Sequence, residues 1–306
     1  MKEIKIFAPA TIANLSCGFD ILGLALDHVG DEMVVRMSDE KGVRITKIIG
    51  QDLPLEPHLN VAGIAAMALL SNLEVDHGFE IEILKNIKPG SGIGSSAASA
   101  AGAVWAINKL LGSPFTPTEL VNFAMEGEKL ASGIAHADNV APALLGGITL
   151  VRSYEPLDVI KLNVPKDLVV TVIHPQIEVK TATAREILRS HVTLKDAIAQ
   201  WGNVAGLVSG LFMEDYDLIG RSLEDKIVEP VRSMLIPAYE AVVEASKNAG
   251  ALGCGISGSG PSIFALSKSA LDAENIKKAM ENVYSNIGIP YDIHISPINQ
   301  SGIKKI

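Results

Sequence analysis

Basic residues, cysteine and aromatic residues are all scarce in this sequence, and each shortage excludes a class of protein. Lysine and arginine number 26 against 35 acidic residues, which gives a formal net charge of −9 for 306 residues. A nucleic-acid partner is therefore not expected, because phosphate binding needs a basic surface. Aromatic residues make up only 5% of the chain, so few rings are available to stack on bases.

Cysteine pairs and membrane-like segments are missing as well. Cys17 and Cys254 lie far apart without CxxC spacing, so neither a disulfide framework nor a zinc site is indicated, and we expect a reducing cytoplasm. The N-terminus carries charges at Lys2 and Glu3 and has no apolar signal-peptide core. Residues 89–108 are uncharged but consist mainly of Gly, Ser and Ala, which insert poorly into bilayers. No membrane partner is expected.

The spacing of apolar residues predicts a mixture of strands and helices. Alternation predicts strands, at residues 4–7, 32–37, 43–48, 79–84, 147–151, 159–162, 168–173, 251–256, 262–266 and 292–296. Helical spacing and capping residues predict helices, from residue 60 and at residues 95–111, 117–132, 139–145, 181–189, 194–212, 239–248 and 270–285. Strands and helices do not alternate steadily, so an α+β fold is expected.

A glycine-rich loop at residues 89–98 lies between a predicted strand and a predicted helix. Gly90, Gly92 and Gly94 free the backbone to curl, and the following helix offers unpaired amides and the positive end of its dipole. These features are typical of a phosphate-binding loop. No lysine follows the last glycine, so the loop is not a Walker A motif. The alternative is a flexible turn before a tightly packed, alanine-rich helix.

Several motifs together resemble those of the GHMP kinase superfamily. The loop PGSGIGSSAAS at residues 89–99 resembles the ATP-binding motif of this superfamily. Residues 255–262 resemble the C-terminal glycine motif of the superfamily, and residues 9–23 resemble its N-terminal motif. Residues 136–143 and 180–185 are similar to the branch of the superfamily whose substrate is L-homoserine.

The resemblance implies a two-domain α+β fold, with an N-terminal domain like the second domain of ribosomal protein S5 and a C-terminal ferredoxin-like domain. Charge and proline cluster at Glu155 and Pro156, so we expect domains at residues 1–155 and 156–289. The last strand, at about residues 290–306, is expected to return to the first domain. The implied activity is ATP-dependent phosphorylation of the L-homoserine hydroxyl in threonine biosynthesis, with ATP and Mg²⁺ as cofactors. A homodimer is a further expectation.

The resemblance also implies a nucleotide site, and its residues are Asn60, Val61, Pro89, Gly90, Ser91, Gly92, Ile93, Gly94, Ser95, Ser96, Ala97, Ala98, Ser99 and Thr181. Ser96 and Glu128 are the implied Mg²⁺ ligands, since this ion prefers oxygen donors. Simpler interpretations remain open. Asn60 and Thr181 are also typical of helix N-caps, and Ser96 is also typical of the first turn of a helix. Glu128 is also typical of a solvated residue that forms an ion pair with Lys129.

Positive side chains are missing from the glycine loop itself. No lysine or arginine lies between Lys88 and Lys109. A phosphate site here is therefore expected to use backbone amides, the helix end and a metal ion.

A free amino acid is a zwitterion, so its pocket needs a guanidinium for the carboxylate and an anion for the ammonium group. By resemblance, the substrate site comprises Asn14, Asp20, His136, Asn139, Arg185 and Arg232. Arg185 and Arg232 suit the carboxylate, and Asp20 suits the ammonium group. Taken alone, Arg185 is also typical of a surface helix, and Arg232 of an ion pair with Glu229.

The general base is left open. Asp138 and Asn139 are the catalytic candidates, because several relatives place an aspartate there, whereas members that phosphorylate homoserine are thought to need no dedicated base. A loose phosphoryl-transfer transition state tolerates this, since the hydroxyl keeps its proton until late. His136 is an alternative proton acceptor, although a lone histidine is as often structural.

Other functions stay open from the sequence alone. One is a superfamily kinase for a different alcohol, although mevalonate and galactose have no ammonium group for Asp20. Another is a non-catalytic nucleotide-binding relative. Residues 253–258 also match GxGxxG, but a predicted strand follows them, whereas a dinucleotide-binding motif opens a helix. An oxidoreductase is therefore not expected.

Overall fold

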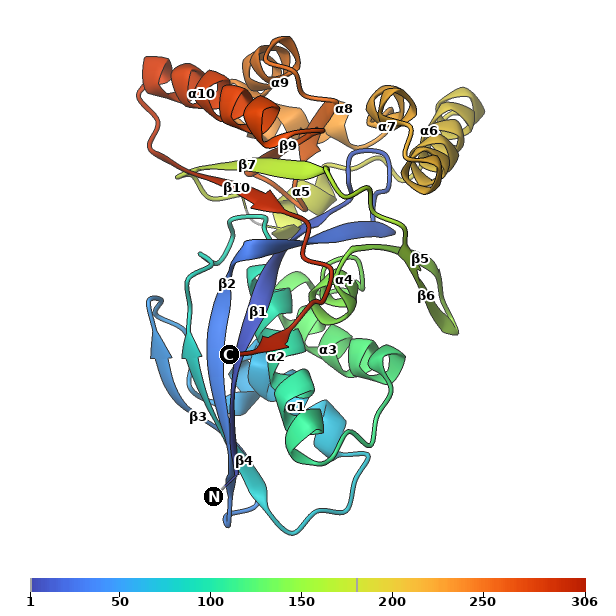
Figure 1. The fold of residues 1–306 in the computed structure, drawn as a ribbon. Helices are drawn as coiled ribbons and strands as arrows, with labels where there is room; N and C mark the ends of the chain where they lie inside the picture. The colour runs from blue at the N-terminus through green and yellow to red at the C-terminus, as the bar shows by residue number, and fades with distance from the viewer. Residues whose placement is uncertain (1, 180) are drawn as a thin grey trace.

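The computed structural model describes residues 2–179 and 181–306, which form two α+β layers, one above the other in Figure 1. The strands of the lower layer are β1 (Glu3–Ala13), β2 (Leu22–Ser38), β3 (Gly42–Ile49), β4 (Gly78–Leu84), β5 (Ile148–Tyr154), β6 (Leu157–Leu162) and β11 (Lys304–Lys305). Their order is β11-β1-β2-β4-β3, and the β5–β6 hairpin pairs with β2. The predicted α+β class is confirmed.

Helices cover one face of the lower sheet (Figure 1): α1 (Val61–Leu70), α2 (Ser95–Leu110), α3 (Pro117–Ser132) and α4 (Val140–Leu145), with a 3₁₀ turn η1 (Pro57–Leu59) before α1. Alanines let α2 approach the sheet, and a Cβ on Gly102 would lie 2.3 Å from Met33 Sδ. A capping box of Thr116 and Glu119 opens α3. This packing fixes the start of α2, where the glycine loop ends.

The upper layer contains the sheet β10-β7-β9-β8, made of β7 (Val169–Pro175), β8 (Gly253–Ile256), β9 (Ile263–Ser267) and β10 (Tyr291–Pro297). Its helices are α5 (Thr181–Glu186), α6 (Leu194–Met213), α7 (Tyr216–Ser222), α8 (Glu229–Arg232), α9 (Tyr239–Asn248) and α10 (Ala270–Ile287), with a 3₁₀ turn η2 (Ser233–Leu235). The GxGxxG segment forms β8 and the turn into the antiparallel strand β9. No helix follows it, which excludes the dinucleotide-binding interpretation.

The chain passes from the lower layer to the upper layer after β6, later than the expected boundary at residue 155. Glu155 and Pro156 form the turn between β5 and β6, and both strands belong to the lower sheet. Proline and charge favour an exposed hairpin turn as much as a linker, which explains the difference. At the other end, β10 pairs with β7 in the upper sheet, and only the segment after Pro297 returns to pair with β1.

Some elements differ from the sequence predictions in length or were not predicted. The strand expected at residues 4–7 continues to Ala13, because residues 8–13 are buried on both faces and therefore show no alternation. The short elements α7, α8 and β11 have too few residues for a periodic signal. None of the helices in the described residues has both the length and the hydropathy needed to cross a bilayer.

Candidate active site

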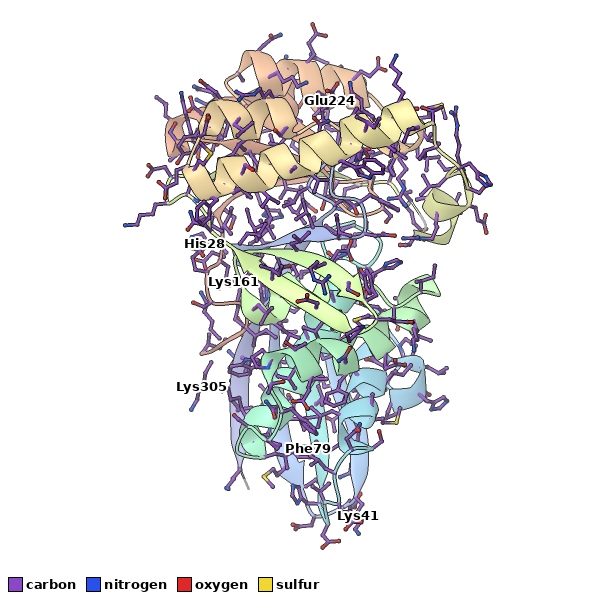
Figure 2. All side chains as sticks on the ribbon, turned by 90° about the vertical axis from the view of Figure 1, so that its right-hand side faces the viewer. His28, Lys41, Phe79, Lys161, Glu224 and Lys305 are labelled. Atoms are coloured by element: carbon purple, nitrogen blue, oxygen red, sulfur yellow. The ribbon has the colours of Figure 1, made fainter. Side chains whose placement is uncertain are left out.

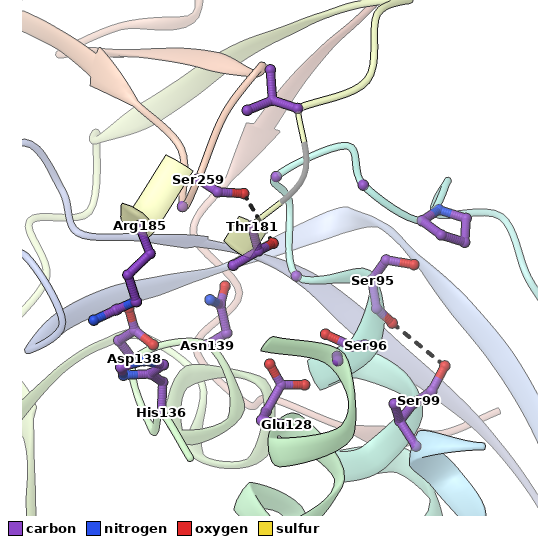
Figure 3. Close-up of a pocket in the computed structure, with 18 of the residues that line it drawn as sticks. Ser95, Ser96, Ser99, Glu128, His136, Asp138, Asn139, Thr181, Arg185 and Ser259 are labelled. Atoms are coloured by element: carbon purple, nitrogen blue, oxygen red, sulfur yellow. Dashed lines mark hydrogen bonds between the residues drawn. The ribbon is translucent and has the colours of Figure 1, made fainter. Parts of the chain in front are cut away.

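A cavity of about 530 Å³ opens between the two layers. Most residues expected at the site line it (Figure 3): Asn14, Asp20, Asn60, Val61, Pro89, Gly90, Gly92, Gly94, Ser95, Ser96, Ser99, Glu128, His136, Asp138, Asn139, Thr181, Arg185 and Arg232. Four expected nucleotide residues do not line it: Ser91, Ile93, Ala97 and Ala98. All four are buried, because successive residues of the loop and of α2 point in different directions and these side chains face the interior.

The glycine loop has the curled backbone that its sequence predicts. Gly90, Gly92 and Gly94 adopt φ values of 75°, 81° and 71°, a region that disfavours other residues. A Cβ on Gly92 would lie 2.6 Å from the carbonyl oxygen of Gly260. Only glycine therefore fits this position without moving the backbone of the second glycine motif.

The second glycine motif holds the first one in place. Ser257 Oγ donates to the carbonyl oxygen of Gly92 over 2.7 Å, and Ser262 Oγ donates to that of Ser91 over 2.6 Å. These bonds tie two carbonyl oxygens of the loop to the second glycine motif. The motif also contributes Gly258 and Ser259 to the cavity wall, two positions that the sequence analysis did not assign.

A buried lysine that precedes the glycine loop supports the start of α2. Lys85 Nζ donates to Asp31, to the carbonyl oxygen of Ser95 and, over 2.8 Å, to Ser99 Oγ. Asp31 in turn accepts from the backbone amides of residues 86 and 87. Burial lowers the pKa of Lys85, and the charge of Asp31 opposes this. Lys85 precedes the glycine loop, so inspecting residues 89–108 alone could not find it.

Ser96 and Glu128 face each other beside the helix start (Figure 3), and their side chains are hydrogen-bonded. Glu128 is buried, and Lys129 pairs instead with Glu126 over 2.6 Å, so the solvated ion pair considered for Glu128 is wrong. Burial raises the pKa of Glu128 to about 7, while Ser96 and Lys85 lower it.

This donor set fits Mg²⁺. Within the described residues, no cluster of three or more His, Cys, Asp or Glu side chains could hold a metal. Mg²⁺ at phosphate sites needs only one or two protein oxygens and takes its other ligands from phosphate and water. Glu128 and Ser96 supply a carboxylate and a hydroxyl at the mouth of the phosphate loop.

At the other side of the loop, Asn60 both caps a helix and lines the cavity. Its Oδ1 accepts from the amide of Ala62 over 3.0 Å, and its Nδ2 donates to the carbonyl oxygen of Pro54 over 2.8 Å. The N-cap interpretation is thus confirmed, and it anchors the Pro54 loop at the cavity wall. Thr181 Oγ1 lies 3.3 Å from Ser259 Oγ, at the start of α5. Lys180, part of the same motif, lies outside the described residues.

The opposite end of the cavity gathers the charged groups expected for an amino acid. Arg185 donates to both carboxylate oxygens of Asp20, over 2.8 and 3.0 Å, and His136 Nδ1 lies 3.7 Å from Asp20 Oδ1. Burial, more than the charge of Arg185, lowers the pKa of Arg232 to about 10. The guanidinium groups of Arg185 and Arg232 lie 5.3 and 4.9 Å from the ring centroid of Phe19. Phe19, in the N-terminal motif, was not assigned from the sequence.

The loop that carries Asp20 has an unusual backbone. Asn14, Leu15, Ser16 and Asp20 all have positive φ, between 43° and 75°, although none is glycine. Such strain persists only where the surroundings hold it, and it gathers at functional sites. Here Asn14 Oδ1 accepts from the amide of Asp20 over 3.1 Å, and its Nδ2 donates to the carbonyl oxygen of Gly258 over 2.8 Å.

Two further side chains brace this loop from outside the cavity. Gln200 of α6 donates to the carbonyl oxygen of Cys17 over 2.6 Å, and Tyr154 Oη donates to that of Asp20 over 2.7 Å. Tyr154 Oη also accepts from the amide of Ala137 over 3.3 Å, which links the loop to the His136 segment.

In Figure 3, Asn139 lies between Arg185 and Glu128, and Asp138 lies beside His136. Asn139 Oδ1 accepts from Thr11 Oγ1 over 2.7 Å, so its amide orientation is fixed. Asp138 is buried, and its Oδ1 has no hydrogen-bond partner within the described residues. Burial, together with the charges of Asp20 and Glu128, raises the pKa of Asp138 to about 8.

Comparison with known proteins agrees with this geometry. Residues 60–147 match the family model of the GHMP kinases N terminal domain, and residues 205–286 that of the GHMP kinases C terminal domain. The chain is 48% identical to a homoserine kinase of Chloroherpeton thalassium, covering 99% of both chains, and 46% identical to one of Chlorobaculum tepidum, covering 100% of this chain and 99% of that protein.

A solved structure is also similar. The crystal structure of homoserine kinase from Cytophaga hutchinsonii superposes with a TM-score of 0.96 at 55% identity and covers 100% of this chain and 98% of that one. The two glycine motifs, the N-terminal motif and the full-length similarity agree with one another. The chain therefore belongs to the homoserine kinase family of the GHMP kinases.

Proposed function

We propose that this chain transfers the γ-phosphoryl group of ATP to the side-chain hydroxyl of L-homoserine, giving O-phospho-L-homoserine for threonine biosynthesis. The observation that carries the proposal is one cavity with two chemically different ends. The glycine loop and the start of α2 suit a polyphosphate. Arg185, Arg232 and Asp20 suit the two charges of an amino acid. The family membership supports both assignments.

At the phosphate end, we assign the backbone amides from Gly90 to Ser96 to the β- and γ-phosphates of ATP. Lys85 keeps these amides in position, since it binds the carbonyl oxygen of Ser95 and the hydroxyl of Ser99. Ser96 and Glu128 would hold Mg²⁺, which neutralises charge on the phosphate oxygens when bound. A cation there favours the ionised form of Glu128 and so offsets the cost of burying this carboxylate.

At the substrate end, we propose that a bound zwitterion inserts between Arg185 and Asp20 and replaces their ion pair. The substrate carboxylate takes the guanidinium groups of Arg185 and Arg232, and the ammonium group takes Asp20. Asn14 and His136 orient Asp20 and complete the polar wall. This exchange keeps Arg185 and Asp20 each paired with an opposite charge, both in the free and in the occupied site.

The transfer forms a bond between the substrate hydroxyl oxygen and the γ-phosphorus, and it breaks the bond from that phosphorus to the ADP oxygen. We propose that Asn139, fixed by Thr11, positions the hydroxyl. Asp138 is a poor base at neutral pH, because a carboxyl group with a pKa of about 8 is mostly protonated there. A loose transition state lets the hydroxyl proton leave late, so no dedicated base is needed.

We further propose that the protein works in the cytoplasm, acts on a small molecule and forms a homodimer. Both cysteines are buried and unpaired, which supports a reducing cytoplasm. The formal net charge of −9 supports a small-molecule substrate without a nucleic-acid partner. The exposed face of α6 supports a homodimer.

A coupled ADP-release assay tests the function. The expected result is Mg²⁺-dependent turnover with L-homoserine and much weaker turnover with mevalonate, galactose and L-serine. Glu128→Ala should abolish turnover, whereas Glu126→Ala, two residues away on the exposed side of α3, should not. Turnover only with an alcohol that lacks an ammonium group would refute the substrate. Tight ATP binding without turnover on any alcohol would instead indicate a non-catalytic relative.

A further inference from the structure

Phe19 places one aromatic ring against both arginines of the substrate end. The guanidinium carbon of Arg185 lies 5.3 Å from the centroid of this ring, and that of Arg232 lies 4.9 Å from it. Phe19 is half-buried and lines the cavity itself. A cation within about 6 Å of an aromatic centroid is attracted by the ring, and guanidinium groups stack well on such rings. A single ring therefore contacts both groups that are assigned to the substrate carboxylate.

The two arginines need such a support, because they repel each other. Burial and, second to it, the positive charge of Arg185 lower the pKa of Arg232 to about 10. Arg232 donates to the carbonyl oxygens of Ala184 and Gly258, over 2.9 and 3.1 Å. Arg185 donates instead to the carboxylate of Asp20, which is the group assigned to the substrate ammonium.

The ring contact does not depend on the group that the substrate takes over. When the ammonium group of the substrate binds Asp20, Arg185 loses the partner that holds it in the free site. The contact with Phe19 involves no atom of Asp20, so it holds the guanidinium near Arg232 in either state. Two arginines that are already gathered meet the carboxylate without a cost of rearrangement, which strengthens binding.

The backbone on both sides of Phe19 is fixed. The amide of Gly18 donates to the carbonyl oxygen of Asn14 over 2.8 Å, and the amide of Leu22 donates to that of Gly18 over 2.9 Å. A Cβ on Gly18 would lie 2.5 Å from Leu22 Cβ, so a larger residue there would displace Leu22. Asp20, the next residue after the ring, has a φ of 62°. The ring therefore projects from a loop with a well-defined shape, as a positioning group requires.

We propose that Phe19 is a positioning residue that holds the guanidinium groups of Arg185 and Arg232 together for the substrate carboxylate, and that it thereby sets the preference for amino acids over amino alcohols. The inference rests on the proposed function, because that function assigns these arginines to the carboxylate of L-homoserine. The alternative is a side chain that only fills the cavity wall. Leucine would fill the wall nearly as well, but it has no ring to attract a cation.

Steady-state kinetics of Phe19→Leu tests the role of the ring. KM for L-homoserine should rise about 10-fold, because two cation–π contacts are lost, and KM for ATP should stay within about 2-fold of wild type. The second ligand is 3-aminopropan-1-ol, which is homoserine without its carboxylate. Its inhibition constant against L-homoserine turnover should change by less than about 3-fold, since it has no group for the arginines. Phe19→Tyr keeps an aromatic face and should keep KM for L-homoserine within about 3-fold of wild type.

Phe7→Leu is the matched control. Lys304 Nζ lies 5.3 Å from the centroid of the Phe7 ring, so this variant also loses a cation–π contact, but neither residue lines the cavity. Figure 2 shows the neighbouring residue Lys305 at the edge of the lower layer. The control should leave KM for L-homoserine unchanged.

Three results would overturn the inference. The first is an unchanged KM for L-homoserine in Phe19→Leu, and the second is a loss in Phe19→Tyr as large as that in Phe19→Leu. The third is an equal weakening of L-homoserine and 3-aminopropan-1-ol, which would mean that the substitution distorts the whole Asp20 loop. Absence of L-homoserine turnover in wild type would refute the proposed function and this inference with it. Normal wild-type turnover with any of the three results refutes only the role of the ring.

Discussion

Glu229 is a partly buried carboxyl group behind the active site, with no ion-pair partner among the described residues. Its Oε1 accepts from the amide of Ile256 over 2.9 Å, and its Oε2 lies 3.3 Å from Ser16 Oγ in the substrate loop. Tyr239 hydrogen-bonds to it as well. Burial raises the pKa of Glu229 to about 8, and the negative charge of Asp225 adds to this.

The direction of the pH effect follows from this raised pKa. An unfolded glutamate releases its proton near pH 4.5, whereas folded Glu229 keeps it up to about pH 8. The folded state therefore binds more protons between these values, and its stability falls as pH rises through the window. At about 1.4 kcal/mol per pH unit, the loss of unfolding free energy from Glu229 alone is roughly 3 kcal/mol between pH 5.5 and pH 9.

Glu229→Gln removes this titration while keeping the shape of the side chain and an acceptor for the Ile256 amide. We expect the variant to match wild type at pH 5.5 and to melt about 5 °C higher at pH 9, in the absence of ligands. Differential scanning calorimetry at both pH values measures the difference. Glu244→Gln, on the exposed side of α9, is the control and should change the melting temperature little at either pH. An equal melting-temperature difference at both pH values for Glu229→Gln would refute the reasoning.

Three further predictions concern kinetics. Ser262→Ala leaves the buried carbonyl group of Ser91 without its donor, so KM for ATP should rise about 10-fold with KM for homoserine nearly unchanged. Arg232→Lys loses the fork that binds Ala184 and Gly258, so KM for homoserine should rise about 10- to 100-fold and KM for ATP should not. Asp138→Asn should keep kcat within about 10-fold at pH 7, because an amide replaces a carboxyl group that is already neutral.

Steady-state kinetics with each substrate varied in turn checks these predictions. A fall of kcat by about 1000-fold or more in Asp138→Asn would identify Asp138 as the base. If Ser262→Ala affected both KM values equally, the second glycine motif would not act through the phosphate loop. If Arg232→Lys raised KM for ATP instead, the cavity ends would be assigned the wrong way round.

Local sequence signals predicted the parts of the site that depend on nearby residues. The alternating glycines at residues 90–94 require a backbone that only glycine adopts easily, and the structure has it. The capping box at Thr116 and Glu119 is likewise complete within four residues. In both cases the physical cause lies within a few neighbouring residues, so the local structure can be predicted without knowing the fold.

The remaining features depend on contacts between distant segments. Ser262 and Ser91 are 171 positions apart, and the Lys85–Asp31 pair spans 54 positions, so no local pattern predicts either contact. Glu128 has charged neighbours in sequence and therefore resembles a solvated residue, yet α3 turns it inward. Its burial, which decides its chemistry, follows only from the packing of α3 against α1 and α2.

The carbonyl group of Gly258 joins the two ends of the cavity. It accepts from Asn14 Nδ2 and from Arg232, both at the substrate end, over 2.8 and 3.1 Å. The adjacent residue Ser257 binds the phosphate loop at Gly92. A shift of this one turn therefore moves the substrate clamp and the phosphate loop together. Because phosphoryl transfer depends mainly on positioning, a shared support keeps the hydroxyl and the γ-phosphorus in register. The second glycine motif is thus a link between two binding sites, as well as part of the nucleotide site.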